Sequence, residues 1–249
     1  MPIWHLSFPP MSSQRKSSAG SFLSGVITLA GRNDVSVDAT LTGLKPLGFS
    51  ISRGRSDEIT GFGDLAPQAS LRWNHGVHNY MTYITGDIPV GAYDPARLAN
   101  IGIGHGAVDG GFGYTYFDPK TGNEFSAVLG FTYNLENQQT DYKNGVDMHL
   151  DWGASKFLTK QLQVGLVGYF YEQISPDSGS GDRVGSFESR VIGIGPQLGF
   201  IFPVGDMQGY LNLKGYKEFA AEHRPDGWNT WLTFVLSPAP PKAVERSMK

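Results

Sequence analysis

The strongest constraint on the fold is a two-residue alternation of side-chain character that recurs along most of the chain. In residues 124–135 apolar side chains occupy every second position over a dozen residues, with polar or small side chains between them. This period is that of a β-strand with one apolar face, and roughly 9–11 tilted residues let a strand cross a bilayer. The apolar positions are Phe125, Ala127, Leu129, Phe131, Tyr133 and Leu135.

The same alternation recurs on both sides of this segment. It is clear downstream and weaker upstream, and eleven strands can be counted in all. We therefore predict an all-β fold, an antiparallel up-and-down transmembrane β-barrel of about 12 strands, of which 11 are readable. The other clear segments are 146–155, 161–170, 191–202, 207–214 and 228–236, and the weaker ones are 21–32, 35–53, 65–74, 80–90 and 106–117.

The connections between these segments alternate in length. Short turns fall at 74–76, 118–122, 159–160 and 203–205, and longer polar loops at 54–63, 91–105, 136–144, 175–186 and 221–226. Outer-membrane barrels have short periplasmic turns and longer external loops, whereas a soluble β-sandwich mixes its loop lengths. The alternation favours the membrane barrel, with the soluble sandwich as the alternative.

An odd strand count leaves the barrel incomplete, because a single-chain bacterial barrel has an even number of strands. We expect one further upward strand, either within residues 1–19 or lost through a misassigned start. Residues 1–20 form an atypical N-terminal segment without a clear signal peptide. The barrel is expected over residues 21–237, followed by a disordered Pro-rich and charged tail at 238–249.

Composition agrees with a strand-built membrane protein. The 249 residues include 33 glycines and 12% aromatic residues, but only 17% are charged, against about 25% in a typical soluble domain. The net charge of −3 gives no reason to expect nucleic acid as a partner. Cysteine is absent, which excludes a disulfide framework and a thiolate metal site.

Motifs that would indicate chemistry are weak. Residues 102–113, GIGHGAVDGGFG, have the spaced glycines of a dinucleotide loop but not the strand and helix around it, so close backbone packing is expected instead. DPKTG at 118–122 is expected to be a hairpin turn. The six histidines lack metal spacing, and we predict no cofactor, no metal and no catalytic residues. His149 and Ser155 share a face but lie too far apart for a direct hydrogen bond.

A polar lumen is the remaining candidate site. Charged side chains facing lipid at mid-bilayer cost about 2–4 kcal/mol for Arg or Lys, so charges on the polar faces are expected to point inward. Acidic residues outnumber basic ones there, which favours cations or neutral solutes. An alternative role is hydrogen bonding within a closed interior. The candidate lumen-lining residues are Arg72, Asp87, Asp109, Glu124, Asp147, His149, Asp151, Glu172, Lys214 and Glu218.

Three segments carry a family resemblance over roughly residues 45–237. TGFGDLAPQASLRWN at 60–74, the stretch 83–117 with TGDIPVGAYDP, and DMQGYLNLKGYKEF at 206–219 resemble the bacterial transporter family named for the meta-pathway of phenol degradation, as does GWNTWLTF at 227–234. The resemblance implies an outer-membrane barrel that admits hydrophobic or aromatic compounds. It implies no particular substrate residues.

The function expected from these observations is a bacterial outer-membrane channel that passes small hydrophobic or aromatic compounds by passive diffusion. Its partners would be outer-membrane lipid, the barrel-assembly machinery and the solute. Two alternatives stay open. A lipid-modifying barrel enzyme would need a close Ser–His–acid cluster, and a closed structural barrel would have a lumen blocked by side chains.

Overall fold

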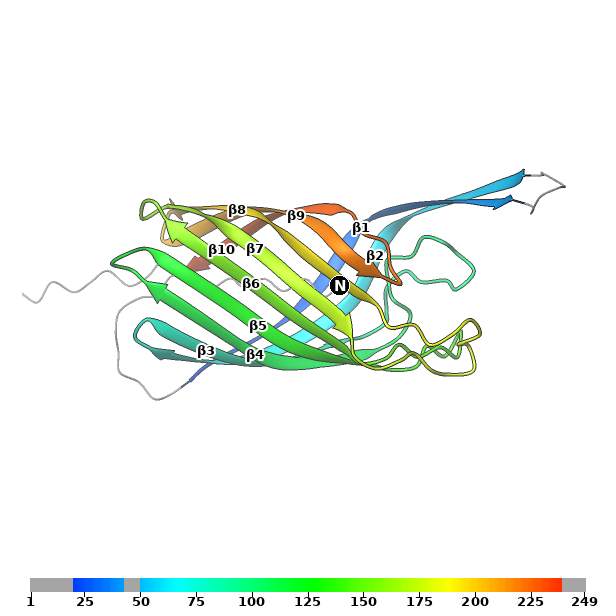
Figure 1. Cartoon of the computed structure of the whole chain (residues 1–249). Coiled ribbons are helices and arrows are strands. Elements are labelled where there is room, and N and C mark those ends of the chain that lie inside the picture. Colours follow the sequence, from blue (N-terminus) through cyan, green and yellow to red (C-terminus); the bar gives the residue numbers. More distant parts are fainter. Residues whose placement is uncertain (1–19, 43–49, 239–249) are drawn as a thin grey trace, which may run out of the picture.

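A computed structural model describes residues 20–42 and 50–238, which form one antiparallel sheet of ten strands in the order of the chain (Figure 1). Every hydrogen-bonded neighbour in the sheet is also a neighbour in sequence, so the topology is a simple up-and-down meander. The strands are β1 (Ser21–Thr42), β2 (Ser50–His75), β3 (His78–Asp87), β4 (Ala107–Asp118), β5 (Asn123–Asn134), β6 (Asp147–Phe157), β7 (Leu162–Gln173), β8 (Arg190–Val204), β9 (Met207–Glu222) and β10 (Trp228–Pro238).

The two ends of the sheet carry different connections, as expected. Short turns join β2 to β3, β4 to β5, β6 to β7 and β8 to β9, and we call this the short-turn end. The loops 88–106, 135–146, 174–189 and 223–227 lie at the opposite, long-loop end (Figure 1). The predicted hairpin at 118–122 is confirmed, because Asp118 accepts hydrogen bonds from Lys120 N and Thr121 Oγ1, and Gly122 has the positive φ of 71° that glycine favours.

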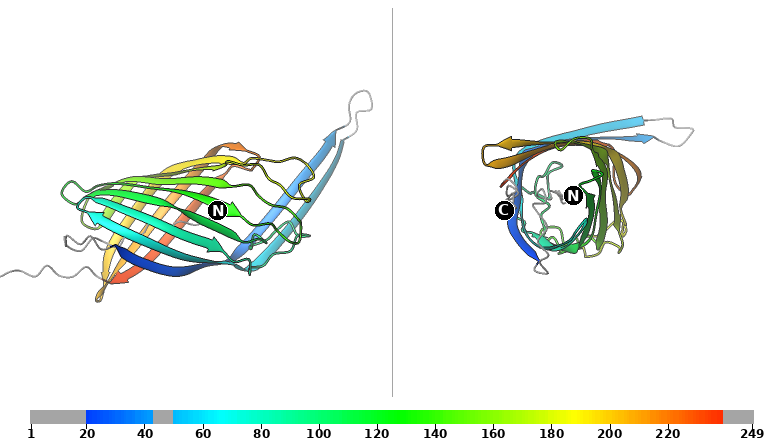
Figure 2. Two further views of the ribbon diagram at one scale, coloured as in Figure 1. Left: turned by 90° about the horizontal axis from the view of Figure 1, so that it is seen from below. Right: turned by 90° about the vertical axis from the view of Figure 1, so that its left-hand side faces the viewer.

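The sheet curls into a barrel. Seen along its axis, the strands follow a ring, with the first and last strands on the same side of it (Figure 2). Within residues 20–42 and 50–238 no pairing joins β1 to β10, so these two strands are the edges of the sheet. The predicted all-β antiparallel barrel is confirmed, with ten strands where eleven segments were counted. The further upward strand, where it was placed in residues 1–19, lies outside the described residues, as do residues 239–249 of the expected tail.

One long hairpin accounts for the difference in strand number. β1 has 22 residues and β2 has 26, and they pair in register from Ser21↔Arg72 to Thr42↔Ser50 with one irregularity near Leu29. The expected loop at 54–63 is therefore wrong, since these residues are strand and pair with residues 30–38. The expected strand 35–53 is divided between β1 and β2. Residues 54–63 are as polar as a loop because the outer half of the β1–β2 hairpin, to which they belong, projects past the rest of the barrel (Figure 1).

The barrel is apolar outside and polar inside. The buried non-glycine side chains of β3–β10 all lie on the inner face, and ten of them are polar against four that are not. Large apolar side chains alternate with them on the outer face and are exposed. This is the reverse of a soluble core. The exposed outer side chains include Tyr80, Ile84, Phe112, Leu129, Phe131, Leu166, Ile194, Leu198, Leu232 and Phe234.

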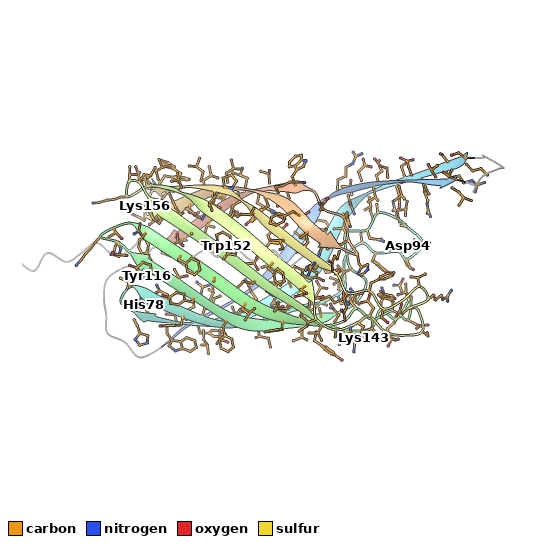
Figure 3. The ribbon with its side chains drawn as sticks, viewed as in Figure 1. His78, Asp94, Tyr116, Lys143, Trp152 and Lys156 are labelled. Atoms are coloured by element: carbon orange, nitrogen blue, oxygen red, sulfur yellow. The ribbon has the colours of Figure 1, made fainter. Side chains whose placement is uncertain are left out.

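Aromatic side chains gather on the outer face near the short-turn end. His78 stacks on Tyr114 with ring centroids 6.0 Å apart, and Tyr114 contacts Tyr80 at 5.6 Å. His78 and Tyr116 both lie toward this end in Figure 3, with their centroids 5.8 Å apart. Such a belt is typical of the level at which a barrel meets lipid headgroups. Within the described residues, no helix has the length and apolar character needed to span a membrane.

Candidate functional site: the lumen of the barrel

The inner face of the barrel holds a connected set of polar side chains, and strand register decides which residues join it. Residues paired across neighbouring strands point to the same face. His149 of β6 pairs with Gly130 of β5 and with Tyr171 of β7, so these three positions face inward together. The same parity carries around the wall from β3 to β10 and defines a lumen lined by hydroxyls, amides and carboxylates.

A histidine held between two carboxylates lies on the wall formed by β4 to β6. His149 Nε2 is 3.0 Å from Asp109 Oδ2, and Nδ1 is 3.2 Å from Asp151 Oδ2. Thr132 Oγ1 donates to Asp109 Oδ2 at 2.5 Å, and Tyr83 Oη lies 3.4 Å from His149 Nε2. His149 and Asp109 are almost fully buried, whereas the Asp151 side chain is 31% exposed. Asp151 is therefore the carboxylate of this group that faces open lumen.

A second cluster surrounds Glu124 nearer the short-turn end. Its Oε1 accepts from Ser126 Oγ at 3.0 Å, and its Oε2 accepts from Ser155 Oγ at 2.6 Å and from Gln163 Nε2. Tyr210 Oη donates to Gln163 Oε1 at 2.9 Å. Three donors compensate the carboxylate for lost water, which is what a charge inside a membrane barrel requires. The cluster links β5, β6, β7 and β9 through side chains alone.

Two tyrosines connect two further acidic side chains, Glu218 and Asp147, to the wall near the long-loop end. Tyr169 Oη donates to Glu218 Oε1 at 2.5 Å. Tyr171 Oη donates to Asp147 Oδ1 at 2.7 Å, and Asn134 Nδ2 donates to Asp147 Oδ2 at 2.8 Å. Both carboxylates therefore have fixed hydrogen-bond donors.

A cavity of about 60 Å³ remains between the inner faces of β5 to β10. That volume holds about five water molecules. Asp151 and Glu124 both line it, and the Lys214 side chain enters it from β9. Asn212, which is 1% exposed, also lines the cavity, and its Oδ1 atom has no hydrogen-bond partner. A polar cavity of this size suits water or a small solute.

The 88–106 loop is fastened to the hairpin at the long-loop end. Asp64 of β2 accepts hydrogen bonds from Gly91 N and Ile103 N, both at 2.7 Å, and so holds both ends of the loop. Gly102 is packed against the same carboxylate, where a Cβ atom would stand 2.9 Å from Oδ1. The expected close backbone packing in the glycine-rich stretch is therefore found here. The loop lies within the outline of the ring when the barrel is seen along its axis (Figure 2).

Asp57, farther out on β2, holds the middle of the same loop. It accepts from Arg97 Nη2 at 2.7 Å, from Arg97 Nε at 3.2 Å, and from the amides of Leu98 and Ala99 at 3.1 and 3.2 Å. The hydrogen bond from the Arg97 guanidinium, with these amides, holds the pKa of Asp57 well below its ordinary value. The carboxylate is charged throughout the ordinary pH range.

The other long loops contact one another around the mouth. Asn137 Nδ2 donates to Tyr93 Oη at 2.8 Å, which joins the 135–146 loop to the 88–106 loop. Tyr142 Oη and Gly145 N both donate to Asp177 of the 174–189 loop. Asp94 and Lys143 mark two of these loops in Figure 3. The loops form a hydrogen-bonded collar at this end of the barrel.

Most of the candidate lumen residues point inward. Strand register places Arg72 on the inner face through its pairing with Met81. It places Lys214 on the inner face through its pairing with Gln197. Glu172 is a correction. It pairs with Met148 and Arg190, which places it on the outer face near the long-loop end. The parity of residues 161–170 already put residue 172 with the apolar set, but its charge suggested the lumen. The residues on the inner face are Arg72, Asp87, Asp109, Glu124, Asp147, His149, Asp151, Lys214 and Glu218.

Charge alone does not identify the neutral residues of the lumen. Gln163, Tyr210 and Asn212 line the cavity as directly as Glu124 does. Their signal was present as position parity, since each lies on the less apolar face of its alternating strand. The loop-fastening role of Asp57 and Asp64 had no signal in the sequence, because it depends on residues about forty positions away.

A Ser–His catalytic pair is not assembled. Ser155 Oγ donates to Glu124, and His149 has carboxylates at both ring nitrogens, so the two belong to separate clusters. Among residues 20–42 and 50–238, no group of three or more His, Asp or Glu side chains is arranged to hold a metal ion.

The class of protein defined by these features is an antiparallel barrel with an apolar outer face and a polar lumen. The family model described as "Putative MetA-pathway of phenol degradation" matches residues 11–234, and the chain belongs to this family. The fold is similar to the crystal structure of the COG4313 outer membrane channel from Pseudomonas putida F1, with a TM-score of 0.62 and 12% sequence identity. That match covers 94% of this chain and 99% of the other. No curated protein matches the chain.

Proposed function

We propose that this protein is a bacterial outer-membrane channel through which small solutes, aromatic compounds among them, diffuse passively. The main observation behind this proposal is that the polarity of the barrel is the reverse of that of a soluble protein, with exposed apolar side chains outside and buried polar ones inside. Only lipid makes such an outer face favourable. Outer-membrane lipid and the barrel-assembly machinery are the partners that this location implies.

Two further observations support the proposal. The similar structure from Pseudomonas putida F1 is described as an outer membrane channel, and the family description names phenol degradation. The lumen is lined by polar atoms and by the rings of Tyr169, Tyr171, Tyr210 and Tyr216. Rings with hydroxyl groups suit a solute that combines an aromatic body with a polar group.

Conductance in planar bilayers tests the proposal with a pair of tryptophan variants. Gly153 lines the cavity, and a Cβ atom there would meet nothing closer than Gln197 Nε2 at 3.5 Å. The Cβ atom of Gly153→Trp is therefore expected to fit without a clash, and its indole ring is expected to fill the lumen. We expect a severalfold lower unit conductance than in the wild type.

Leu129→Trp is the control, because Leu129 lies on the exposed outer face of β5. It should leave conductance unchanged. A wild-type protein that migrates as a folded barrel in detergent but gives no conductance steps would contradict the channel and favour the closed structural barrel.

A further inference from the structure

The cavity between β5 and β10 has an uneven charge distribution. Two carboxylates, Glu124 and Asp151, and one ammonium group, Lys214, line it. Asp109 is set farther back, nearly buried, with the His149 ring between it and Asp151. In a cavity of about 60 Å³ such charges are screened by only a few water molecules, so their sum acts on any ion that enters.

One buried acceptor at the wall of this cavity and one acceptor beside it lack a hydrogen bond. Asn212 Oδ1 is buried and unpartnered, and the Asn212 side chain is 1% exposed at the cavity wall. Asp109 Oδ1 is a second buried acceptor without a hydrogen bond. A buried carbonyl oxygen without a donor is costly unless water or a ligand satisfies it. Acceptors of this kind replace the hydration shell of a cation and do nothing for an anion.

Lys214 is the opposing group. Its ammonium makes no hydrogen bond or ion pair with any residue of the described ranges, although it lies within electrostatic reach of both Asp151 and Glu124. Glu124, in contrast, is held by three hydrogen-bond donors and is a fixed charge. Lys214 therefore offsets part of the negative charge in the cavity without cancelling it in a tight pair.

We propose that this cavity is a cation-selecting site in which Asp151 attracts small monovalent cations and Lys214 limits that attraction. The site holds two negative charges and one positive charge at its wall, so a cation is favoured over an anion of equal size. The inference rests on the proposed function, since only an open channel has ion selectivity, and it identifies which small charged solutes pass.

Reversal potentials in a KCl gradient across planar bilayers test the proposal. Asp151→Asn makes the cavity wall neutral, and Lys214→Met leaves two uncompensated carboxylates. We expect the ratio of potassium to chloride permeability to follow the order Lys214→Met, wild type, Asp151→Asn, from highest to lowest. Each charge removed should change the permeability ratio by about threefold at 0.1 M salt. The differences should shrink at 1 M salt because the screening length is shorter there.

Asp206→Asn is the matched control. Asp206 is an exposed carboxylate in the two-residue turn between β8 and β9, outside the lumen, and its removal should leave the ratio unchanged. A conducting wild type that prefers chloride, or a ratio unmoved in both cavity variants, would overturn the cation site while leaving the channel in place. Absence of any conductance would instead refute the channel itself.

Discussion

Gly130 faces the lumen from β5, directly across from His149 on β6. A Cβ atom at this position would overlap both Tyr83 Oη and His149 Nε2, so glycine is what allows the histidine to reach Asp109. At the scale of single residues, the lumen depends on such missing side chains as much as on the polar groups themselves. The small residues between the apolar positions of each strand therefore provide space for neighbouring side chains.

Gly130→Ala tests this role. The added methyl group must displace Tyr83 or His149, and overpacking of this kind costs about 1–3 kcal/mol. We expect a lower free energy of unfolding, measured by urea titration of protein refolded into lipid vesicles. Gly31→Ala is the control, because a Cβ atom there meets nothing within 4 Å. Equal stability of the two variants would contradict the packing described for Gly130.

At the scale of elements, the outer half of the β1–β2 hairpin acts as a support for the 88–106 loop. Asn33 of β1 donates to Asn100 O at 2.8 Å, and Arg55 of β2 donates to Ala96 O at 3.0 Å, next to the contacts of Asp57. A two-stranded ribbon alone is marginally stable in water. The loop and the ribbon therefore stabilise each other at the mouth.

The pH dependence of this attachment follows from Asp57. Its pKa is lower in the folded protein than its ordinary value, so the stabilisation is present above the ordinary pKa and is lost only as pH falls through the lowered one. Hydrogen exchange of the Leu98 and Ala99 amides, corrected for intrinsic rates, should therefore show the same protection at pH 7 and pH 4.

Asp57→Asn removes the charge that holds Arg97. We expect lower protection of both amides at pH 7 and faster tryptic cleavage after Arg97. Asp38→Asn changes a carboxylate of the same hairpin beyond the loop contacts and should leave both measurements as in the wild type. Protection that disappears in the wild type near pH 4 would show that Asp57 titrates normally.

At the scale of the whole molecule, the exposed apolar outer surface suits contact with lipid. Phe112, at the centre of β4, is 73% exposed, and Val184 in the 174–189 loop is 80% exposed. In water these two positions would tolerate a charge equally. In a bilayer only Phe112 meets hydrocarbon, so the membrane barrel predicts opposite results for the same substitution.

Phe112→Arg should destabilise the barrel in lipid vesicles by about 2–4 kcal/mol, the cost of arginine at the mid-bilayer of a barrel. Val184→Arg should change the free energy of unfolding little, because its side chain lies in a loop. Both are measured by reversible urea unfolding in vesicles. Similar small effects at the two positions would indicate that β4 does not face lipid.

The sequence by itself determined the strand-built architecture, the alternation of turns and loops, and the faces of nine of ten charged candidates. These properties depend on period and polarity, which are local. Glu172 is the exception, because its charge predicts the lumen whereas its position in the alternation places it on the outer face. Residues 54–63 are polar enough to predict a loop, although they belong to the hairpin and pair with residues 30–38.

Only the tertiary structure decided how these residues meet. Asp109, His149 and Asp151 come from two strands, and the Glu124 cluster from four, so their contacts depend on register and curvature. The narrow cavity, the unpartnered Asn212 Oδ1 and the fastening of the 88–106 loop depend on the same long-range geometry. An alternating pattern gives the direction of a side chain, but the distance across the lumen is set by how the whole sheet curls.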